Sequence, residues 1–216
     1  MKVPPRTSAE PVEAFCITLI CFGWPIFSSI RFVLDGFQGK GEFSDQGFVR
    51  LMAMELILGS IALGFLYARK FSLASLYPSP SVKGVGVGII LYMAAVVASW
   101  IFMAPFASTQ STQPIETMLS TASASAATIV PAAVLNGTFE ETFLLGVLLR
   151  GMSKYGASVA LGIMLLVRLL YHLYQGPLGA VSVLGFGAVL GIYYMRTERL
   201  FPVVFAHILA DIVPFL

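Results

Sequence analysis

Long apolar segments alternate with short polar gaps over almost the whole chain. A transmembrane helix needs about 17–25 mostly apolar residues to cross the hydrocarbon layer of a bilayer. The segments fit this length, so the pattern predicts about seven membrane-spanning helices, with six or eight as alternatives. The predicted spans cover residues 11–34, 47–67, 84–106, 126–149, 157–174, 177–195 and 200–216. A further helix over 116–125 is expected at the membrane interface, and the count of spans depends mainly on residues 116–131.

The composition supports this interpretation. The chain is 57% hydrophobic and 11% charged, with a mean hydropathy of +0.86, whereas a soluble domain is about a quarter charged. We expect an all-α, polytopic bundle forming one transmembrane domain over 1–216, with a core over 126–216 that carries the motifs described below. A net charge of +2 gives no sign of nucleic-acid binding. The expected partners are membrane lipid and a membrane-associated peptide or protein, and the oligomeric state is left open.

The lysines and arginines predict the orientation, because positive residues gather on the cytoplasmic side of membrane proteins. With the N-terminus inside, nine face the cytoplasm and three the opposite side, and Arg168 lies within a span. The inner group is Lys2, Arg6, Arg69, Lys70, Lys83, Arg150, Lys154, Arg196 and Arg199, and the outer group is Arg31, Lys40 and Arg50. We therefore expect Pro78, Lys154 and Glu198 on the cytoplasmic side and Gly41, Ser111 and Gly176 on the other, in a bacterial cytoplasmic membrane.

Two adjacent carboxylates, Glu140 and Glu141, interrupt a stretch that is otherwise apolar or small from residue 122 to residue 149. Ionisable groups at membrane depth cost several kcal/mol, so they usually mark a functional site. The alternative is a structural ion pair between helices. Glu55, in the second span, is a further candidate for the same site, but it belongs to no motif, so a structural partner or a shallow position is favoured over it by about three to one.

Four further polar residues lie within the later spans: Arg168, His172, His207 and Asp211. The two histidines are the only ones in the chain. Arg168 and His172 are four residues apart, as are His207 and Asp211, so each pair shares a helix face. The many glycines of these segments permit close helix packing. We therefore expect one polar cluster formed by three helices, whereas Tyr171 and Tyr174 are expected to be aromatic residues of the membrane interface.

This set of residues permits activation of a water molecule. A glutamate in a low-dielectric site can act as a general base, and a neutral imidazole can share the proton or donate to an oxyanion. Carboxylates with two histidines also resemble a metal site, but the Glu-x-x-His and His-Glu-x-x-His spacings are absent. No metal and no other cofactor is therefore expected. Cys16 and Cys21 lie on different helix faces and are interpreted as packing residues.

The order of these residues resembles the CPBP family, which comprises CAAX proteases and bacteriocin-processing or immunity proteins and is also called the Abi family. The eukaryotic type II CAAX prenyl endopeptidase belongs to it. The resemblance covers residues 140–211. The family's Glu-Glu-x-x-x-Arg-Gly motif corresponds to Glu140-Glu141-Thr-Phe-Leu-Leu145-Gly146, its Phe-x-x-x-His motif to Arg168-Leu-Leu-Tyr-His172, and its final motif to Ala206-His207-Ile-Leu-Ala-Asp211. The run Arg-x-x-Tyr-His-Leu-Tyr-Gln-Gly resembles a bacterial variant.

The resemblance implies a metal-independent glutamate protease within the membrane. By this analogy Glu140 and His172 activate the water, His207 and Asp211 stabilise the oxyanion, and Glu141 supports the site. Asp211 stands where the best-known members have Asn, so it must be protonated or must orient His207. Two other functions stay open: a catalytically idle immunity or scaffold protein, which the departures favour slightly, and a small proton-coupled transporter. Inverted repeats, which would favour a transporter, are not seen.

Two structural expectations follow. Leu145 replaces the motif arginine, and we expect Arg168 to take its place and to pair with Glu141, because a buried cation needs a carboxylate. His172 lies about 22 Å along the fifth span and His207 about 10 Å along the seventh. The two rings can meet only if the fifth helix starts later, tilts or is broken, so a predicted boundary between residues 151 and 177 must be wrong.

Overall fold

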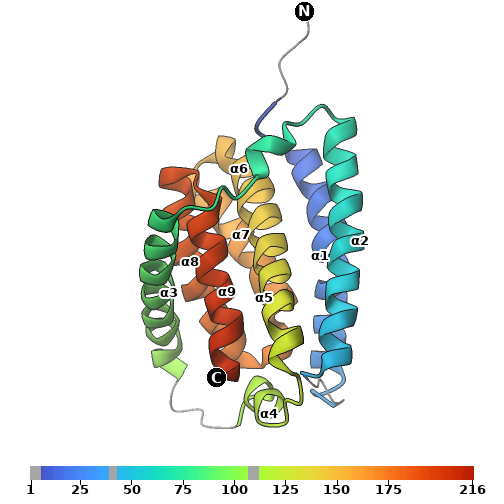
Figure 1. Ribbon diagram of the computed structural model, residues 1–216, viewed down its shortest axis with the longest axis vertical. Helices are drawn as coiled ribbons and strands as arrows, with labels where there is room; N and C mark the ends of the chain where they lie inside the picture. Colours follow the sequence, from blue (N-terminus) through green and yellow to red (C-terminus); the bar gives the residue numbers. More distant parts are fainter. Residues whose placement is uncertain (1–5, 39–42, 107–111) are drawn as a thin grey trace, which may run out of the picture.

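The computed structural model describes residues 6–38, 43–106 and 112–216, and these are almost entirely helical (Figure 1). The main helices are α1 (Pro11–Leu34), α2 (Asp45–Ala68), α3 (Val82–Met103), α4 (Pro114–Ser120), α5 (Ala126–Glu141), α6 (Arg150–Met152), α7 (Ala157–Tyr171), α8 (Pro177–Thr197) and α9 (Leu200–Ile212). A π-helix, Thr142–Leu149, joins α5 to α6. Short 3-10 turns cover Leu73–Leu76, Ala104–Phe106, Ser153–Tyr155, Leu173–Gln175 and Val213–Phe215. The all-α class is confirmed.

Within the described residues, five helices are long and apolar enough to cross a membrane: Pro11–Leu34, Asp45–Ala68, Val82–Phe106, Ala126–Tyr155 and Pro177–Thr197. The two other predicted spans correspond to shorter apolar helices, Ala157–Tyr171 and Leu200–Phe215. The outer faces of α1 and α3 expose large apolar side chains such as Trp24 and Trp100. Such faces suit contact with lipid tails, as expected for a membrane bundle.

The centre of the bundle is the continuous helical segment formed by α5, the π-helix and α6. In Figure 1, α5 stands between α9 on one side and α1 and α2 on the other. Its most apolar window is 78% buried, against 17% to 44% for the other four long helices. A helix enclosed in this way can hold polar groups on several faces without exposing them to lipid. The two glutamates end α5 directly before the π-helix, an irregularity that frequently accompanies functional sites.

Close packing of α3 against α8 depends on glycine. A Cβ built on Gly185 would lie 2.6 Å from the backbone carbonyl carbon and oxygen of Ala98. The hydroxyl of Ser99 donates to the carbonyl oxygen of Ser182 over 2.8 Å in the same contact. The backbones of α3 and α8 therefore meet without an intervening side chain, which is the role of small residues in membrane helix packing.

The fifth predicted span starts at Ala157 as expected, but its predicted end near Tyr174 is wrong. Helix α7 ends at Tyr171, and His172 is its C-terminal capping residue. A 3-10 turn follows, and then Gly176 adopts a positive φ of 88° before α8 begins. The helix is thus broken at His172. This is one of the three ways in which the rings of His172 and His207 could meet in spite of their different predicted depths in the membrane. The predicted interfacial helix over 116–125 is also displaced, because α4 covers Pro114–Ser120.

Charged residues concentrate at one end of the bundle. Arg6 and Arg69 both donate to Glu13 Oε1 over 2.8 Å, Lys154 pairs with Glu10, and Arg150 pairs with Glu198. These contacts bring together segments that the sequence predicted to be cytoplasmic. Gly176 and α4 lie at the other end (Figure 1). Lys2, Lys40, Gly41 and Ser111, which also entered the orientation prediction, lie outside the described residues.

Candidate active site

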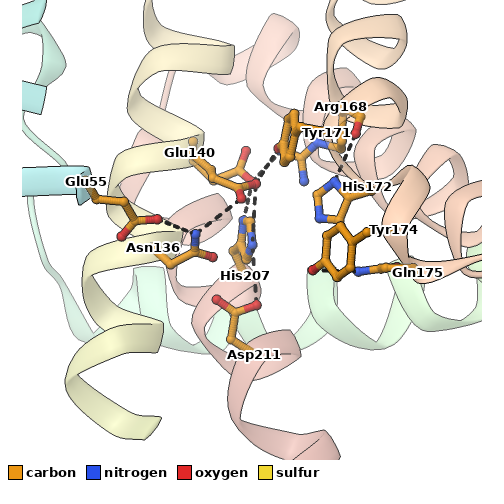
Figure 2. A network of polar contacts seen from close by, with 11 residues as sticks. Glu55, Asn136, Glu140, Arg168, Tyr171, His172, Tyr174, Gln175, His207 and Asp211 are labelled. Atoms are coloured by element: carbon orange, nitrogen blue, oxygen red, sulfur yellow. Dashed lines mark hydrogen bonds and ion pairs between the residues drawn. The ribbon is translucent and has the colours of Figure 1, made fainter. Parts of the chain in front are cut away.

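The predicted polar residues gather in the middle of the bundle, as Figure 2 shows for all of them except Glu141. Glu140 and Glu141 come from the end of α5, Arg168 and His172 from the end of α7, and His207 and Asp211 from α9. The i,i+4 spacing on α7 and α9 turns each pair toward the central helix. Three segments that are far apart in sequence therefore contribute to one cluster.

Glu141 is the buried centre of this cluster, with a side chain that is 0% exposed. Its Oε1 lies 2.6 Å from Nη2 of Arg168 and 2.5 Å from Nδ1 of His207. The side chain of Arg168 is 1% exposed, so both charges of the ion pair are removed from solvent. The predicted pairing of Arg168 with Glu141 is thus confirmed. Within the described residues, Oε2 of Glu141 and Nε of Arg168 are buried and have no hydrogen-bond partner.

His207 connects the supporting pair to the cavity. Its Nδ1 contacts the carboxylate of Glu141, which can only accept, so this nitrogen carries a proton. Its Nε2 lies 3.8 Å from Oε2 of Glu140 and 3.6 Å from Oδ1 of Asp211. Both separations exceed ordinary hydrogen-bond lengths. The Nε2 side of the ring therefore faces two carboxyl groups and remains available for another partner.

Glu140 is held at both carboxyl oxygens. The hydroxyl of Tyr171 donates a short hydrogen bond to Oε2, and Nδ2 of Asn136 donates to Oε1 over 3.2 Å. Tyr171 is 6% exposed, and its ring stacks on Phe22 with centroids 5.1 Å apart. Its predicted place at the membrane interface is therefore wrong: it is a buried partner of the carboxylate. Tyr174 lies beside His172, with ring centroids 6.1 Å apart, and also lines the cavity.

His172 lies in the cavity wall, where its ring is oriented by its own helix. Its Nδ1 is 2.9 Å from the backbone carbonyl oxygen of Arg168. A carbonyl oxygen only accepts, so Nδ1 carries the proton and Nε2 is left with a lone pair. This is the tautomer that a second proton acceptor beside Glu140 requires. The break of α7 at this residue frees the ring to lie within the cavity.

A cavity of about 1240 Å³ adjoins the cluster. Glu140, Arg168, His172, His207 and Asp211 all line it, whereas Glu141 does not. From these residues the cavity extends toward the end of the bundle that holds α4. Its lining there comes from the end of α1, the start of α2, α4 and the C-terminal turn, with Asp35, Phe43, Phe48, Ile115, Met118 and Phe215. The walls are largely apolar, which suits a ligand with a hydrophobic part.

Asn136 and Glu55 also belong to the site, although the motifs did not indicate them. Glu55 on α2 is 3% exposed and accepts a hydrogen bond from Nδ2 of Asn136 over 2.7 Å. Glu55 therefore joins the cluster, which was the less favoured of the two interpretations, because it is connected to Glu140 through Asn136 and lines the same cavity. The four-residue spacing of Asn136 and Glu140 could have indicated their contact. The contact between Glu55 on α2 and Asn136 on α5 joins residues that are far apart in the sequence, so no local spacing indicates it.

Metal ligands would have to come from the same cluster. In residues 6–38, 43–106 and 112–216, no group of three or more His, Cys, Asp or Glu side chains has the arrangement needed to hold a metal ion. Nδ1 of His207 is engaged by Glu141 and Nδ1 of His172 by a backbone carbonyl, so only Nε2 of each ring is left for another contact. Cys16 and Cys21 are both free and lie on α1, outside the cluster.

Residues 122–213 match the family of type II CAAX prenyl endopeptidases described as Rce1-like. No curated protein and no solved structure matches the chain significantly. The matched segment begins just before α5 and ends just after α9. It contains Glu140, Glu141, Arg168, His172, His207 and Asp211, together with Asn136 and Tyr171. The predicted resemblance to the CAAX proteases is thereby confirmed, and the site lies within the matched segment.

Proposed function

We propose that the protein is an intramembrane endopeptidase in which Glu140 activates a water molecule to hydrolyse a peptide bond of a membrane-associated substrate. The observation that carries this proposal is the position of Glu140. Its carboxylate is held by two donors at the wall of a large cavity that two imidazole rings also line. A carboxylate with a fixed orientation beside a space for substrate suits a general base.

The reaction would proceed by direct attack of water. Glu140 takes a proton from the water while its oxygen attacks the carbonyl carbon of the scissile bond. The Nε2 lone pair of His172 offers a second acceptor for this proton. The C–N bond then breaks, the nitrogen receives the proton, and the products are a carboxylate and an amine. No group other than water is consumed.

His207 is proposed to stabilise the oxyanion formed on the carbonyl oxygen. Its Nδ1 already carries a proton that Glu141 accepts, so the ring must be the doubly protonated imidazolium in order to donate from Nε2. The carboxyl groups of Glu140 and Asp211 lie near Nε2 and favour this charged form, and Glu141 fixes the direction of the Nε2 hydrogen. A donor that is already oriented before reaction stabilises the transition state most effectively. Asp211, with Oδ1 at 3.6 Å from Nε2, is proposed to orient His207 rather than to donate itself.

The departures from the family motifs have structural explanations under this proposal. Leu145 is fully buried in the π-helix and brings no charge to Glu141. Arg168 reaches Glu141 from α7 instead and supplies the cation. This pairing supports an active enzyme over an idle relative. The substrate is proposed to be a lipid-anchored or otherwise membrane-bound peptide, because the cavity is largely apolar and lies within a membrane bundle.

The test is cleavage of membrane-tethered and prenylated peptides by the purified protein in liposomes, followed by mass spectrometry. Glu140→Gln keeps the shape of the side chain and one of its two hydrogen-bond acceptors but cannot take a proton from water, so it should lose more than about 99% of the activity. Glu198→Gln, at the exposed end of α8, is the matched control and should retain wild-type activity. In water enriched in ¹⁸O, one heavy oxygen should enter the new carboxylate.

A chelator distinguishes the proposed mechanism from metal catalysis. Activity should be unchanged in chelator, and its loss with recovery on addition of zinc would contradict direct activation by Glu140. Full activity in Glu140→Gln would also contradict it. If the folded wild-type protein cleaves no peptide of the panel, the endopeptidase proposal fails, and the immunity or scaffold function becomes the better one.

A further inference from the structure

Glu55 is a buried carboxyl group that no motif and no step of the proposed reaction uses. It lies in the middle of α2 and is 3% exposed. Its Oε1 accepts one hydrogen bond, from Nδ2 of Asn136, and its Oε2 is buried without any partner among the described residues. An unsatisfied buried polar atom destabilises a fold. Packing alone therefore gives no reason for a carboxyl group here, since an apolar side chain of similar size would avoid this cost.

The partner of Glu55 also contacts the proposed catalytic base. Nδ2 of Asn136 lies 2.7 Å from Oε1 of Glu55 and 3.2 Å from Oε1 of Glu140. A side-chain amide nitrogen has two hydrogens, one for each carboxyl group. Figure 2 shows the resulting line of contacts, which runs from Glu55 through Asn136 to Glu140. The amide therefore joins a helix outside the matched family segment to the centre of the site.

Two acceptors on the same side determine which end of the amide faces them. With only Glu140 present, the amide could turn over and leave Glu140 without this donor. The turned amide would place its own oxygen against both Glu55 and Glu140, where oxygen opposes oxygen. With Glu55 in place, turning the amide over would lose two hydrogen bonds instead of one, so the arrangement that donates to Glu140 is favoured more strongly. Tyr171 holds the other oxygen of Glu140. The carboxylate is then fixed at both ends.

We propose that Glu55 is a positioning residue of the site: through the amide of Asn136 it holds Glu140 in its reactive orientation. Its effect on catalysis rests on the proposed function, but its effect on Asn136 does not. A small displacement of a catalytic group can reduce a rate by about a hundredfold. The hydrogen bond at Oε1 carries the effect, so a glutamine at position 55, whose amide oxygen can accept, should preserve it.

The kinetic test compares Glu55→Met with Glu55→Gln. Glu55→Met removes the acceptor and should lower kcat by about ten- to a hundredfold, with KM unchanged within about twofold, because substrate contacts are kept. Its thermal stability should equal or exceed that of the wild type, because the unsatisfied oxygen is gone. Glu55→Gln should keep kcat within about threefold. Adding Asn136→Ala to Glu55→Met should cause no further loss, because both changes break one chain of contacts.

A purely structural role predicts the opposite pattern. Glu55→Met would then keep the wild-type kcat per folded molecule, or its loss of activity would follow a loss of folded protein. Either result overturns the proposal while leaving the endopeptidase function intact. Equal loss of kcat in Glu55→Gln and Glu55→Met would also overturn it, because glutamine retains the acceptor.

An NMR experiment tests the hydrogen bond between Asn136 and Glu55 even if no cleavage is found. Asn136 is the only asparagine of the chain, so protein labelled with ¹⁵N-asparagine has a single asparagine side-chain NH₂ group in its NMR spectrum. Its two hydrogens should give separate, downfield resonances in the wild type. In Glu55→Met one of them should move upfield, and in Glu55→Gln both should stay near their wild-type positions. Unchanged resonances in Glu55→Met would overturn the proposal.

Discussion

The supporting ion pair shows how one residue can replace another from a different helix. The family motif places an arginine four residues after the second glutamate, where this chain has Leu145. Here the guanidinium comes from Arg168 on α7 and lies 2.6 Å from Oε1 of Glu141. Glu141 in turn contacts Nδ1 of His207 over 2.5 Å. The cation thus fixes the group that orients the proposed oxyanion donor, so its loss affects both stability and the site.

Arg168→Leu should therefore be strongly destabilising. Removing one partner of a buried ion pair typically costs about 3–5 kcal/mol, because the other charge stays buried without compensation. The midpoint of thermal unfolding in detergent should fall accordingly. Arg168→Leu combined with Leu145→Arg should recover part of the loss, since an arginine at 145 lies near the same face of the helix as Glu141. Equal stability of wild type and Arg168→Leu would show that the pair contributes nothing.

Sequence could identify some of these residues because their signals are local. Two glutamates in an apolar stretch, and polar pairs four residues apart on α7 and α9, are visible without a structure. The contact between Glu55 and Asn136 joins residues that are 81 positions apart. Tyr171 is adjacent to His172, but only the burial of its ring against Phe22 distinguishes it from an aromatic residue of the membrane interface. Such contacts depend on packing between helices, which periodicity does not encode.

At the scale of helices, the existence of each predicted span was easier to predict than its irregularities. The apolar pattern indicated α1, α2, α3 and α8 closely. The π-helix over Thr142–Leu149 was not predicted, because π turns and regular helix share the same composition. The break at His172 was predicted only as one of three ways in which His172 and His207 could meet. Both irregularities adjoin the site. Local backbone geometry therefore contributes to the site in a way that hydropathy alone cannot indicate.

The contact between α3 and α8 gives a test of packing. In Gly185→Ala the new Cβ would lie 2.6 Å from backbone atoms of Ala98, which cannot move aside as a side chain does. The helices must separate, and we expect a loss of about 1–3 kcal/mol or more in the free energy of unfolding.

Gly162→Ala is the matched control for this substitution. Gly162 is an exposed glycine within α7 whose Cβ would meet nothing within 4 Å. Alanine favours helix over glycine by up to about 1 kcal/mol, so this variant should be as stable as the wild type or slightly more stable. Thermal unfolding of both purified variants provides the comparison. Equal behaviour of the two variants would contradict the close approach of α3 and α8.

At the scale of the whole molecule, the two ends of the bundle differ in charge. The start of α1, the end of α2, the start of α3, the segment from α6 to α7 and the turn between α8 and α9 lie at the end with α6 (Figure 1). These segments carry Arg6, Arg69, Lys70, Lys83, Arg150, Lys154, Arg196 and Arg199. The other end holds Arg31 and Arg50 among the described residues. The sequence predicted this division from the order of spans alone, because each crossing reverses the side of the next loop. The fold agrees with the division, and the direction in which the bundle is inserted stays a prediction based on positive charge.

Cysteine labelling in intact cells tests this orientation. In a background of Cys16→Ala and Cys21→Ala, a maleimide that cannot cross membranes should label Thr112→Cys and not Lys154→Cys. Thr112 is exposed beside α4 and is a better probe than Gly176, where a Cβ would lie 2.4 Å from Pro114. Lys154→Cys should become reactive only after the cells are permeabilised. The reverse pattern would place the N-terminus outside.

The direction of the cavity has a pharmacological consequence. The cavity reaches from Glu140 toward the end with α4, opposite the basic end. In the predicted orientation that end faces away from the cytoplasm. An inhibitor that cannot cross membranes, added to the outside of intact cells, would then reach the proposed catalytic carboxylate without entering the cell, and efflux pumps or cytoplasmic degradation would give no protection against it.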